Sequence, residues 1–214
     1  TADHRVMLEQ PEKVIYGFRA LMKASGVSRG VVCIEDNKPD AIEAMKDAMV
    51  SYPELELAVL PARYPRGGEK QLVQGVMGRE VPPPPGLPLD VGVIVSNVGT
   101  ACAMAEAMLT GLPLVERVVT VTGEGISSPK NFKALIGTPL SFLIEKAGGF
   151  SGTPGKVIMG GPMMGPSVKS LDVPVLKGTS GILVLTKVQA VKEPVLPYIR
   201  CGKCVEACPT RLQP

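Results

Sequence analysis

Residues 29–60 read RGVVCIEDNKPDAIEAMKDAMVSYPELELAVL, and this stretch decides the fold class. Its two ends, Arg29 to Glu35 and Leu55 to Leu60, are apolar runs of the length of a buried strand. Between them a helix is expected from Pro39, because apolar residues recur there at helical spacing, at Ile42, Met45 and Met49. A strand, a helix and a second strand in this order predict a parallel β-α-β unit.

The residues around this unit continue the same alternation of helix and strand. We expect three further helices and one further strand: helices at 11–25, 67–77 and 100–109, and a strand at Val91 to Val95. Pro11 suits the first position of a helix and Gly26 suits its end. Residues 1–112 are therefore predicted to form an α/β domain with an open, mostly parallel sheet and helices on its faces.

The pattern changes after Pro113. Four strands and one helix are expected in the second part of the chain: strands at 117–122, 132–136, 156–159 and 181–186, and a helix at 139–146. A hairpin, a helix and then returning strands are the order of a β-grasp unit, which we place at residues 113–190. Pro194 and Pro197 indicate a linker into a third segment, residues 191–214.

Composition excludes several classes of function. The chain has 214 residues, 45% of them hydrophobic, and a net charge of +3, which suits a folded protein with a real core. With no Trp and 4% aromatic residues, a base-stacking surface for nucleic acid is not expected. No apolar run is long enough to cross a membrane. The chain starts at Thr1 without an initiator Met, which suggests an internal fragment of a longer protein.

A cysteine cluster lies near the end of the chain. Residues 201–209 read CGKCVEACP and match the last three cysteines and the proline of the bacterial ferredoxin pattern C-x2-C-x2-C-x3-C-P, while Tyr198 stands in the first cysteine's place. The candidate metal ligands are Cys201, Cys204 and Cys208. In two-cluster ferredoxins the last cysteine serves the other cluster, so Cys208 is expected to face a different cluster from Cys201 and Cys204. The alternatives are a zinc site or inert thiols.

A glycine pair, Gly67-Gly68, stands at the start of the helix expected at 67–77. Glycines let backbone N–H groups approach a phosphate or a flat ring, and a helix start favours negative charge. Three nearby cations would add to this attraction: Arg63, Arg66 and Lys70. The alternative is an ordinary turn with solvated charges.

A second polar group, Ser96 to Thr100, follows the strand expected at 91–95. Ligands of open α/β sheets bind beyond the carboxyl ends of strands, so Asn97 and Thr100 are well placed for binding. Simple capping of the next helix by Ser96 or Asn97 is the alternative.

Five blocks in order along the chain resemble the C subunit of the Rnf electron transport complex: residues 1–7, 34–41, 64–70, 160–165 and 177–182. That family is similar to the NADH-oxidising flavin subunit of respiratory complex I. The resemblance implies an α/β domain that binds FMN, a soluble-ligand-binding β-grasp (SLBB) domain and two 4Fe-4S clusters. It places Gly67, Gly68 and Glu69, beside Lys70, in the nucleotide and flavin region. It places Ser96, Asn97 and Thr100 where the flavin phosphate and ribityl chain are held.

The resemblance also implies partners and a location. They are NADH or NAD, and the other subunits of a membrane-bound complex on the cytoplasmic side of the bacterial inner membrane, where this subunit is peripheral. Two alternatives stay open. One is a corrin reductase of the same superfamily. The other is a non-catalytic docking fragment, because the glycine-rich segment and the second ferredoxin motif of the family are missing.

Overall fold

The structure is a computed structural model that describes residues 2–191, 197, 199–208 and 212. Its first half contains the elements α1 (Ala2–Glu9), α2 (Pro11–Ser25), β1 (Gly30–Glu35), α3 (Pro39–Met49), β2 (Leu55–Leu60), α4 (Glu69–Met77), the short 3-10 helix η1 (Pro88–Val91) and α5 (Val98–Thr110). Its second half contains β3 (Glu116–Thr122), β4 (Lys130–Leu135), α6 (Leu140–Lys146), β5 (Pro154–Met159) and β6 (Gly181–Thr186), and a short helix α7 (Lys203–Ala207) follows. The predicted linker around Pro194 and the ligand position at Tyr198 lie outside the described residues.

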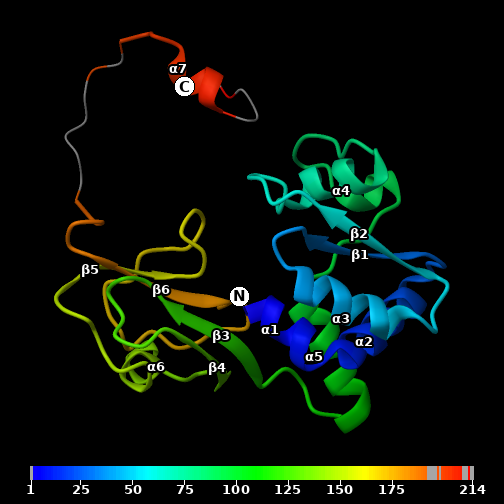
Figure 1. The fold of residues 1–214 in the computed structure, drawn as a ribbon, viewed down its shortest axis with the longest axis horizontal. Coiled ribbons are helices and arrows are strands. Elements are labelled where there is room, and N and C mark those ends of the chain that lie inside the picture. Colours follow the sequence, from blue (N-terminus) through cyan, green and yellow to red (C-terminus); the bar gives the residue numbers. More distant parts are fainter. Residues whose placement is uncertain (1, 192–196, 198, 209–211, 213–214) are drawn as a thin grey trace.

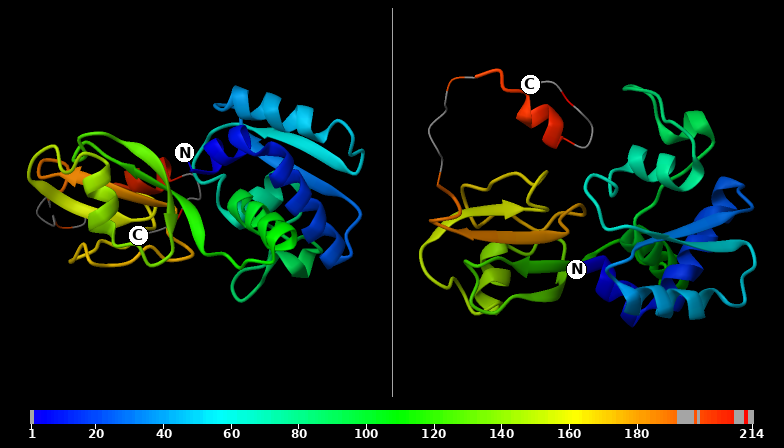
Figure 2. Two further views of the ribbon diagram at one scale, coloured as in Figure 1. Left: turned by 90° about the horizontal axis from the view of Figure 1, so that it is seen from below. Right: turned by 45° about the horizontal axis from the view of Figure 1, so that its top comes forward.

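The predicted β-α-β unit is confirmed. Strands β1 and β2 are parallel, with Gly30 opposite Leu55 and Glu35 opposite Leu60. Helix α4 lies on one side of this strand pair and α2, α3 and α5 on the other (Figures 1 and 2). The core of this half is formed by apolar residues of α1, α2, α3, β1, β2 and α5, among which Ala41 and Met45 are fully buried. Helix α1, which periodicity did not predict, packs on α3 and α5.

The predicted strand Val91–Val95 is wrong. Val91 ends the 3-10 helix η1, Gly92 takes a left-handed φ of 69°, and residues 93–97 belong to no helix or strand. A cavity of about 500 Å³ is lined by Val93, Ile94 and Val95 together with residues of β1. A strand is defined by hydrogen bonds to a neighbour. These valines and the isoleucine have the composition of a strand, but among the described residues β1 pairs only with β2.

Helices α2 and α5 pack with their backbones in close approach. A Cβ atom added at Gly17 would lie 1.8 Å from the carbonyl oxygen of Ala101 and 3.1 Å from the nitrogen of Ala105. An ion pair between Lys13 and Glu106 joins the same two helices. Glycine at position 17 therefore sets how closely α5, and the residues that precede it, approach the rest of the domain.

The predicted β-grasp unit is confirmed in the second half. Its sheet has the strand order β4-β3-β6-β5, with β3 and β6 parallel and the two outer pairs antiparallel. Helix α6 buries Leu140, Leu143 and Ile144 in a core that is separate from that of the first half. The proposed boundary near residue 113 falls between α5 and β3, and helix α1 lies between the two halves (Figure 1). Across the described residues we find no helix of a length and apolarity that could span a bilayer.

Candidate functional site

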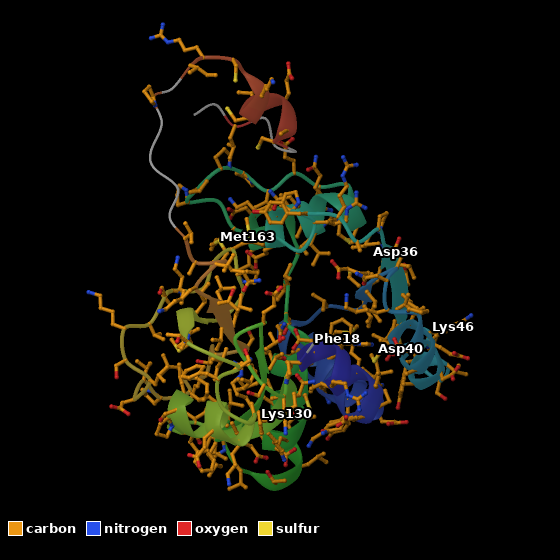
Figure 3. The ribbon with its side chains drawn as sticks, turned by 60° about the vertical axis from the view of Figure 1, so that its left-hand side comes forward. Phe18, Asp36, Asp40, Lys46, Lys130 and Met163 are labelled. Atoms are coloured by element: carbon orange, nitrogen blue, oxygen red, sulfur yellow. The ribbon has the colours of Figure 1, made fainter. Side chains whose placement is uncertain are left out.

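The loop at residues 61–68 connects the carboxyl end of β2 to α4. Its anchor is Asp36 at the end of β1 (labelled in Figure 3), which accepts the backbone N–H of Ala62 over 3.0 Å through Oδ1 and donates its own N–H to Leu60 over 2.8 Å. Gly68 is the residue before α4, and its N–H donates to the carbonyl of Pro65. This loop lies at the edge of the parallel strand pair where open α/β proteins bind ligands.

The two glycines of this loop differ in their surroundings. A Cβ atom at Gly68 would lie 2.6 Å from Oε1 of Gln71, the end of a flexible side chain, and 3.1 Å from the carbonyl oxygen of Pro65, so a larger residue would fit only after these groups move. A Cβ atom at Gly67 would meet nothing within 4 Å. The backbone beside Gly67 is thus open to an incoming group, whereas that beside Gly68 is already covered.

The two charged residues that follow the glycines have different roles. Lys70 donates its ammonium group to the carbonyl oxygens of Pro82 (2.5 Å) and Gly86 (2.9 Å), so it holds the 82–86 loop against α4. Glu69 is exposed in the first turn of α4. The positive charge of Lys70 remains near the loop, but its ammonium group already donates hydrogen bonds to these two backbone carbonyls.

The second predicted group lies at the start of α5. Asn97 is the residue before this helix, and its Oδ1 accepts the backbone N–H of Gly99 over 2.8 Å, as the capping alternative expected. Its Nδ2 donates to Oδ2 of Asp3, also over 2.8 Å. Ser96 and Asn97 line the cavity beside β1, and Thr100 is exposed. Asp3 lies on the unpredicted helix α1, and sequence reasoning missed it because no pattern linked it to residue 97.

The two groups do not line a common cavity. Ser96 and Asn97 face the 500 Å³ cavity, which contains residues from the middle of α4 but none of Gly67 to Lys70. A second cavity of about 420 Å³ opens beside the loop at residues 61–68, on the side of Gln71 and Gln74. The assignment of Gly67, Gly68, Glu69, Lys70, Ser96, Asn97 and Thr100 to one cofactor stays a prediction.

The cysteine segment forms one short helical turn. Gly202 precedes α7 with a left-handed φ of 72°, and the N–H of Cys208 donates to the carbonyl of Cys204. Cys201 and Cys204 are exposed and Cys208 is half-buried. Within the described residues, no three cysteine, histidine or acidic side chains are gathered as a metal site would need. The structure therefore does not bring Cys201, Cys204 and Cys208 together.

The other two cysteines lie in the first half of the molecule. Burial raises the pKa of the Cys33 thiol, and it raises that of Cys102 against the opposing effect of Lys13 and Lys133. Both thiols are thus less acidic than an exposed cysteine.

Comparison with protein families divides the chain in two. Residues 1–106 match the model of the Nuo51 FMN-binding domain family, and residues 118–167 match that of the SLBB domain family. The first match covers the α/β half, including the loop at residues 61–68 and the start of α5. The second covers β3 through β5 of the β-grasp half.

Curated relatives match along the whole chain. It is 51% identical to the C subunit of the Na+-translocating ferredoxin:NAD+ oxidoreductase complex of Acetobacterium woodii and 48% identical to the proton-translocating counterpart of Clostridium ljungdahlii. It is 44% identical to the C subunit of the ion-translocating oxidoreductase complex of Rhodobacter capsulatus. The chain spans 48%, 46% and 41% of these three proteins respectively.

A solved structure has the same fold. A chain in the crystal structure of an NAD+-reducing NiFe hydrogenase, in the H2-reduced state, superposes with a TM-score of 0.67 at 20% identity. The superposition covers 86% of the present chain and 38% of that chain. The arrangement of an α/β half followed by a β-grasp half is therefore shared between the two proteins.

Proposed function

Because the chain belongs to the family of C subunits of ion-translocating oxidoreductase complexes, to which it is 44–51% identical along its whole length, we propose that it is part of the electron-input subunit of such a complex. In this function, electrons pass between NAD(H), a flavin and iron–sulfur clusters. The observation that carries the proposal is the similarity, over the whole length of this chain, to two relatives named as ferredoxin:NAD+ oxidoreductase subunits.

FMN is the proposed flavin, supported by the match of residues 1–106 to an FMN-binding domain family. The open backbone at Gly67 and the cavity lined by Ser96 and Asn97 are compatible with a bound cofactor at this edge of the sheet. The residues proposed to hold it are Gly67, Gly68, Glu69, Lys70, Ser96, Asn97 and Thr100. When bound, FMN accepts a hydride as two electrons and can pass them on singly. The chain's own contribution is to position the cofactor through α4 and α5.

The iron–sulfur clusters are proposed for the longer protein. A 4Fe-4S cluster takes four thiolates, and the described segment supplies three that are not gathered around one point. The fit is therefore incomplete, and no electron-transfer step is assigned to Cys201, Cys204 or Cys208. The spacing of these cysteines supports the proposal that they become ligands once further ligands are present.

A position at the cytoplasmic face of the bacterial inner membrane, as a peripheral subunit beside the other subunits of the complex, is part of the same proposal. The names of the relatives, which describe ion-translocating complexes, support the membrane-associated part of this proposal. The same names favour this function over the corrin reductase alternative.

The test is reduction of bound flavin by NADH. The protein is expressed at the full length of its gene, loaded with FMN and freed of excess cofactor. Its absorbance at about 450 nm, where oxidised flavins absorb, is then followed in the absence of oxygen. We expect NADH to bleach the bound flavin. Bleaching by dithionite but not by NADH would reject the proposed function. Absence of stoichiometric FMN from the 214-residue chain would favour the docking alternative for this part of the protein.

A further inference from the structure

The 420 Å³ cavity beside α4 has two arginines in its lining. It is an open recess between the loop at residues 61–68 and one face of the helix, and its lining residues are Arg63, Tyr64, Pro65, Arg66, Gln71, Gln74 and Gly75. Its volume falls within the range of roughly 300–1,000 Å³ that is typical of small-molecule sites. None of the residues expected to hold the cofactor lines it.

The two arginines of this recess have no partner for their side chains in the described part of the chain. Other arginines of the same half are engaged: Arg5, Arg19 and Arg29 form ion pairs with Glu9, Glu54 and Glu56. The guanidinium groups of Arg63 and Arg66 form none of the hydrogen bonds or ion pairs found among the described residues. An arginine without a carboxylate keeps its planar set of donors available for phosphate, to which it binds bidentately.

The surroundings compensate this charge only in part. Between Pro61 and Gly75 the sequence holds two arginines and Lys70 against the single carboxylate of Glu69. The nearby carboxylate of Asp36, which accepts a hydrogen bond from the backbone of Ala62, adds a second negative charge. The start of α4 adds the positive end of a helix dipole to the same place. The remaining positive charge and the helix start both attract an anion to the recess.

The uncharged lining indicates which kind of anion would fit. Tyr64 is 66% exposed, so its ring is available to stack on a planar group. Gln71 and Gln74 are one helical turn apart on the wall of the recess, and their amides can bond sugar hydroxyls. A charged group beside a flat ring and hydroxyls is the chemistry of a nucleotide.

We propose that Arg63 and Arg66 form a subsite for the phosphate of a nucleotide, with Tyr64 against its planar ring. The inference rests on the proposed function, because it assigns one part of the nucleotide to residues outside the expected cofactor set. Two nucleotides carry this chemistry, a nicotinamide dinucleotide and FMN, and the experiment must distinguish them.

The test uses calorimetric titration of the chain with ADP-ribose, FMN and riboflavin. We expect Arg63→Gln and Arg66→Gln each to weaken binding of a phosphate-bearing probe about tenfold, the loss expected for a charged hydrogen bond, and to leave riboflavin binding unchanged. A loss confined to ADP-ribose assigns the subsite to the dinucleotide, and a loss confined to FMN assigns it to the flavin phosphate. Arg5→Gln, which removes an equal charge from α1, is the matched control and should change neither.

Three results would overturn the subsite: no effect of either arginine on any probe, equal weakening of riboflavin, or the same loss in Arg5→Gln. Unchanged melting temperatures of the variants exclude unfolding as the cause, since neither guanidinium supports the fold. Tyr64→Leu should weaken ADP-ribose or FMN but leave inorganic pyrophosphate unaffected, and a loss of pyrophosphate binding in this variant would contradict the stacking role. If the arginine variants fail this test while NADH still bleaches bound flavin, the subsite alone is rejected. If NADH does not bleach bound flavin, the proposed function is rejected.

Discussion

Asn97 donates its side-chain amide to Oδ2 of Asp3 over 2.8 Å, although the two residues are 94 positions apart. Its Oδ1 accepts the backbone N–H of Gly99, so both polar ends of one side chain are in use. The first helix of the chain is thereby fixed against the start of α5. A residue expected to contact a cofactor thus also has a structural role in the fold.

Replacement of Asn97 should reveal that role. Loss of a helix cap typically costs about 1 kcal/mol of the free energy of unfolding, and Asn97→Ala should lose at least that amount because Asp3 also loses its donor. Asn97→Asp keeps the cap but places two carboxylates together, and adding Asp3→Asn should recover most of the loss. Urea unfolding measures these changes, with Ser96→Ala as the control. Equal stability of Asn97→Ala and Ser96→Ala would contradict the contact.

Gly17 offers a sharper test of packing. Alanine at this position should lower the free energy of unfolding by about 1–3 kcal/mol or more, because its Cβ would overlap the backbone of Ala101 and force α2 and α5 apart. The matched control is Gly75→Ala in α4, where a Cβ meets nothing within 4 Å. That substitution should be neutral or stabilising by up to about 1 kcal/mol from helix propensity. Circular dichroism during urea unfolding reports both, and a stable Gly17→Ala protein would refute the close approach.

Periodicity predicted those elements whose stability is encoded locally. The predicted bounds are confirmed for α2, which begins at Pro11 and ends before Gly26, and for the strand Leu55–Leu60. Proline, glycine and the spacing of apolar residues each influence the element in which they occur, so the sequence of that element is enough to predict it. The run at Val91–Val95 has equally good strand composition, but a strand also needs an edge to bond with, and composition does not encode its neighbour. Helix α1 was missed because its hydrophobic stripe is weak.

The candidate site follows the same division. Residue types and the order of elements placed Gly67–Lys70 and Ser96–Thr100 between predicted strands and helices. The structure puts them at the starts of α4 and α5, but the strand expected before Ser96 does not form. It could not be foreseen that Lys70 bonds the carbonyls of Pro82 and Gly86, or that Asn97 bonds Asp3. Both contacts join residues that are separated in sequence. Lys70 bonds backbone carbonyls of a loop and Asn97 bonds a single aspartate, and neither kind of partner belongs to a sequence motif.

The bond between His4 and Asp40 predicts a pH dependence. Nε2 of His4 lies 2.8 Å from Oδ1 of Asp40 on α3 (labelled in Figure 3), and this contact lowers the pKa of the carboxyl below its ordinary value of 3.8. A carboxyl with a lowered pKa in the folded state stabilises the protein above its unfolded-state pKa and loses that contribution as pH falls through the folded value.

Asp40→Asn should therefore lower the melting temperature between about pH 5 and pH 6, where the carboxyl is ionised, and should make no difference in strong acid. Asp47→Asn, on the exposed side of the same helix, is the control and should follow the wild type throughout. Scanning calorimetry at several pH values measures both. A difference between wild type and Asp40→Asn that persists unchanged below pH values of about 3 would contradict the contribution of this contact.

The cysteines should differ in their reactivity toward alkylation. The thiolate is the reactive form, and burial raises the pKa of Cys33 and Cys102. At neutral pH these two should react with iodoacetamide more slowly than the exposed Cys201 and Cys204, since burial lowers both their thiolate fraction and their access to the reagent. Peptide mass spectrometry after timed quenching reads the rates, and labelling in urea, which should equalise them, is the control. Equal rates in the native protein would show that Cys33 is not protected.

The last prediction concerns iron. A 4Fe-4S cluster takes four thiolates, and the segment at residues 201–209 offers three, with tyrosine in the place of the first cysteine at position 198. In the described structure Cys204 and Cys208 are adjacent in one helical turn but belong to no gathered set of ligands. We expect chemical reconstitution of the 214-residue chain to yield fewer than about four irons per chain.

Tyr198→Cys alone should not restore a full complement, because the ferredoxin pattern assigns Cys208 to a different cluster from Cys201 and Cys204. Adding the second ferredoxin motif of the family together with Tyr198→Cys should yield two clusters. Iron and sulfide counts with an EPR spectrum of the reduced protein decide the matter, and about four irons on the unmodified chain would mean that all three cysteines serve one cluster with a further ligand.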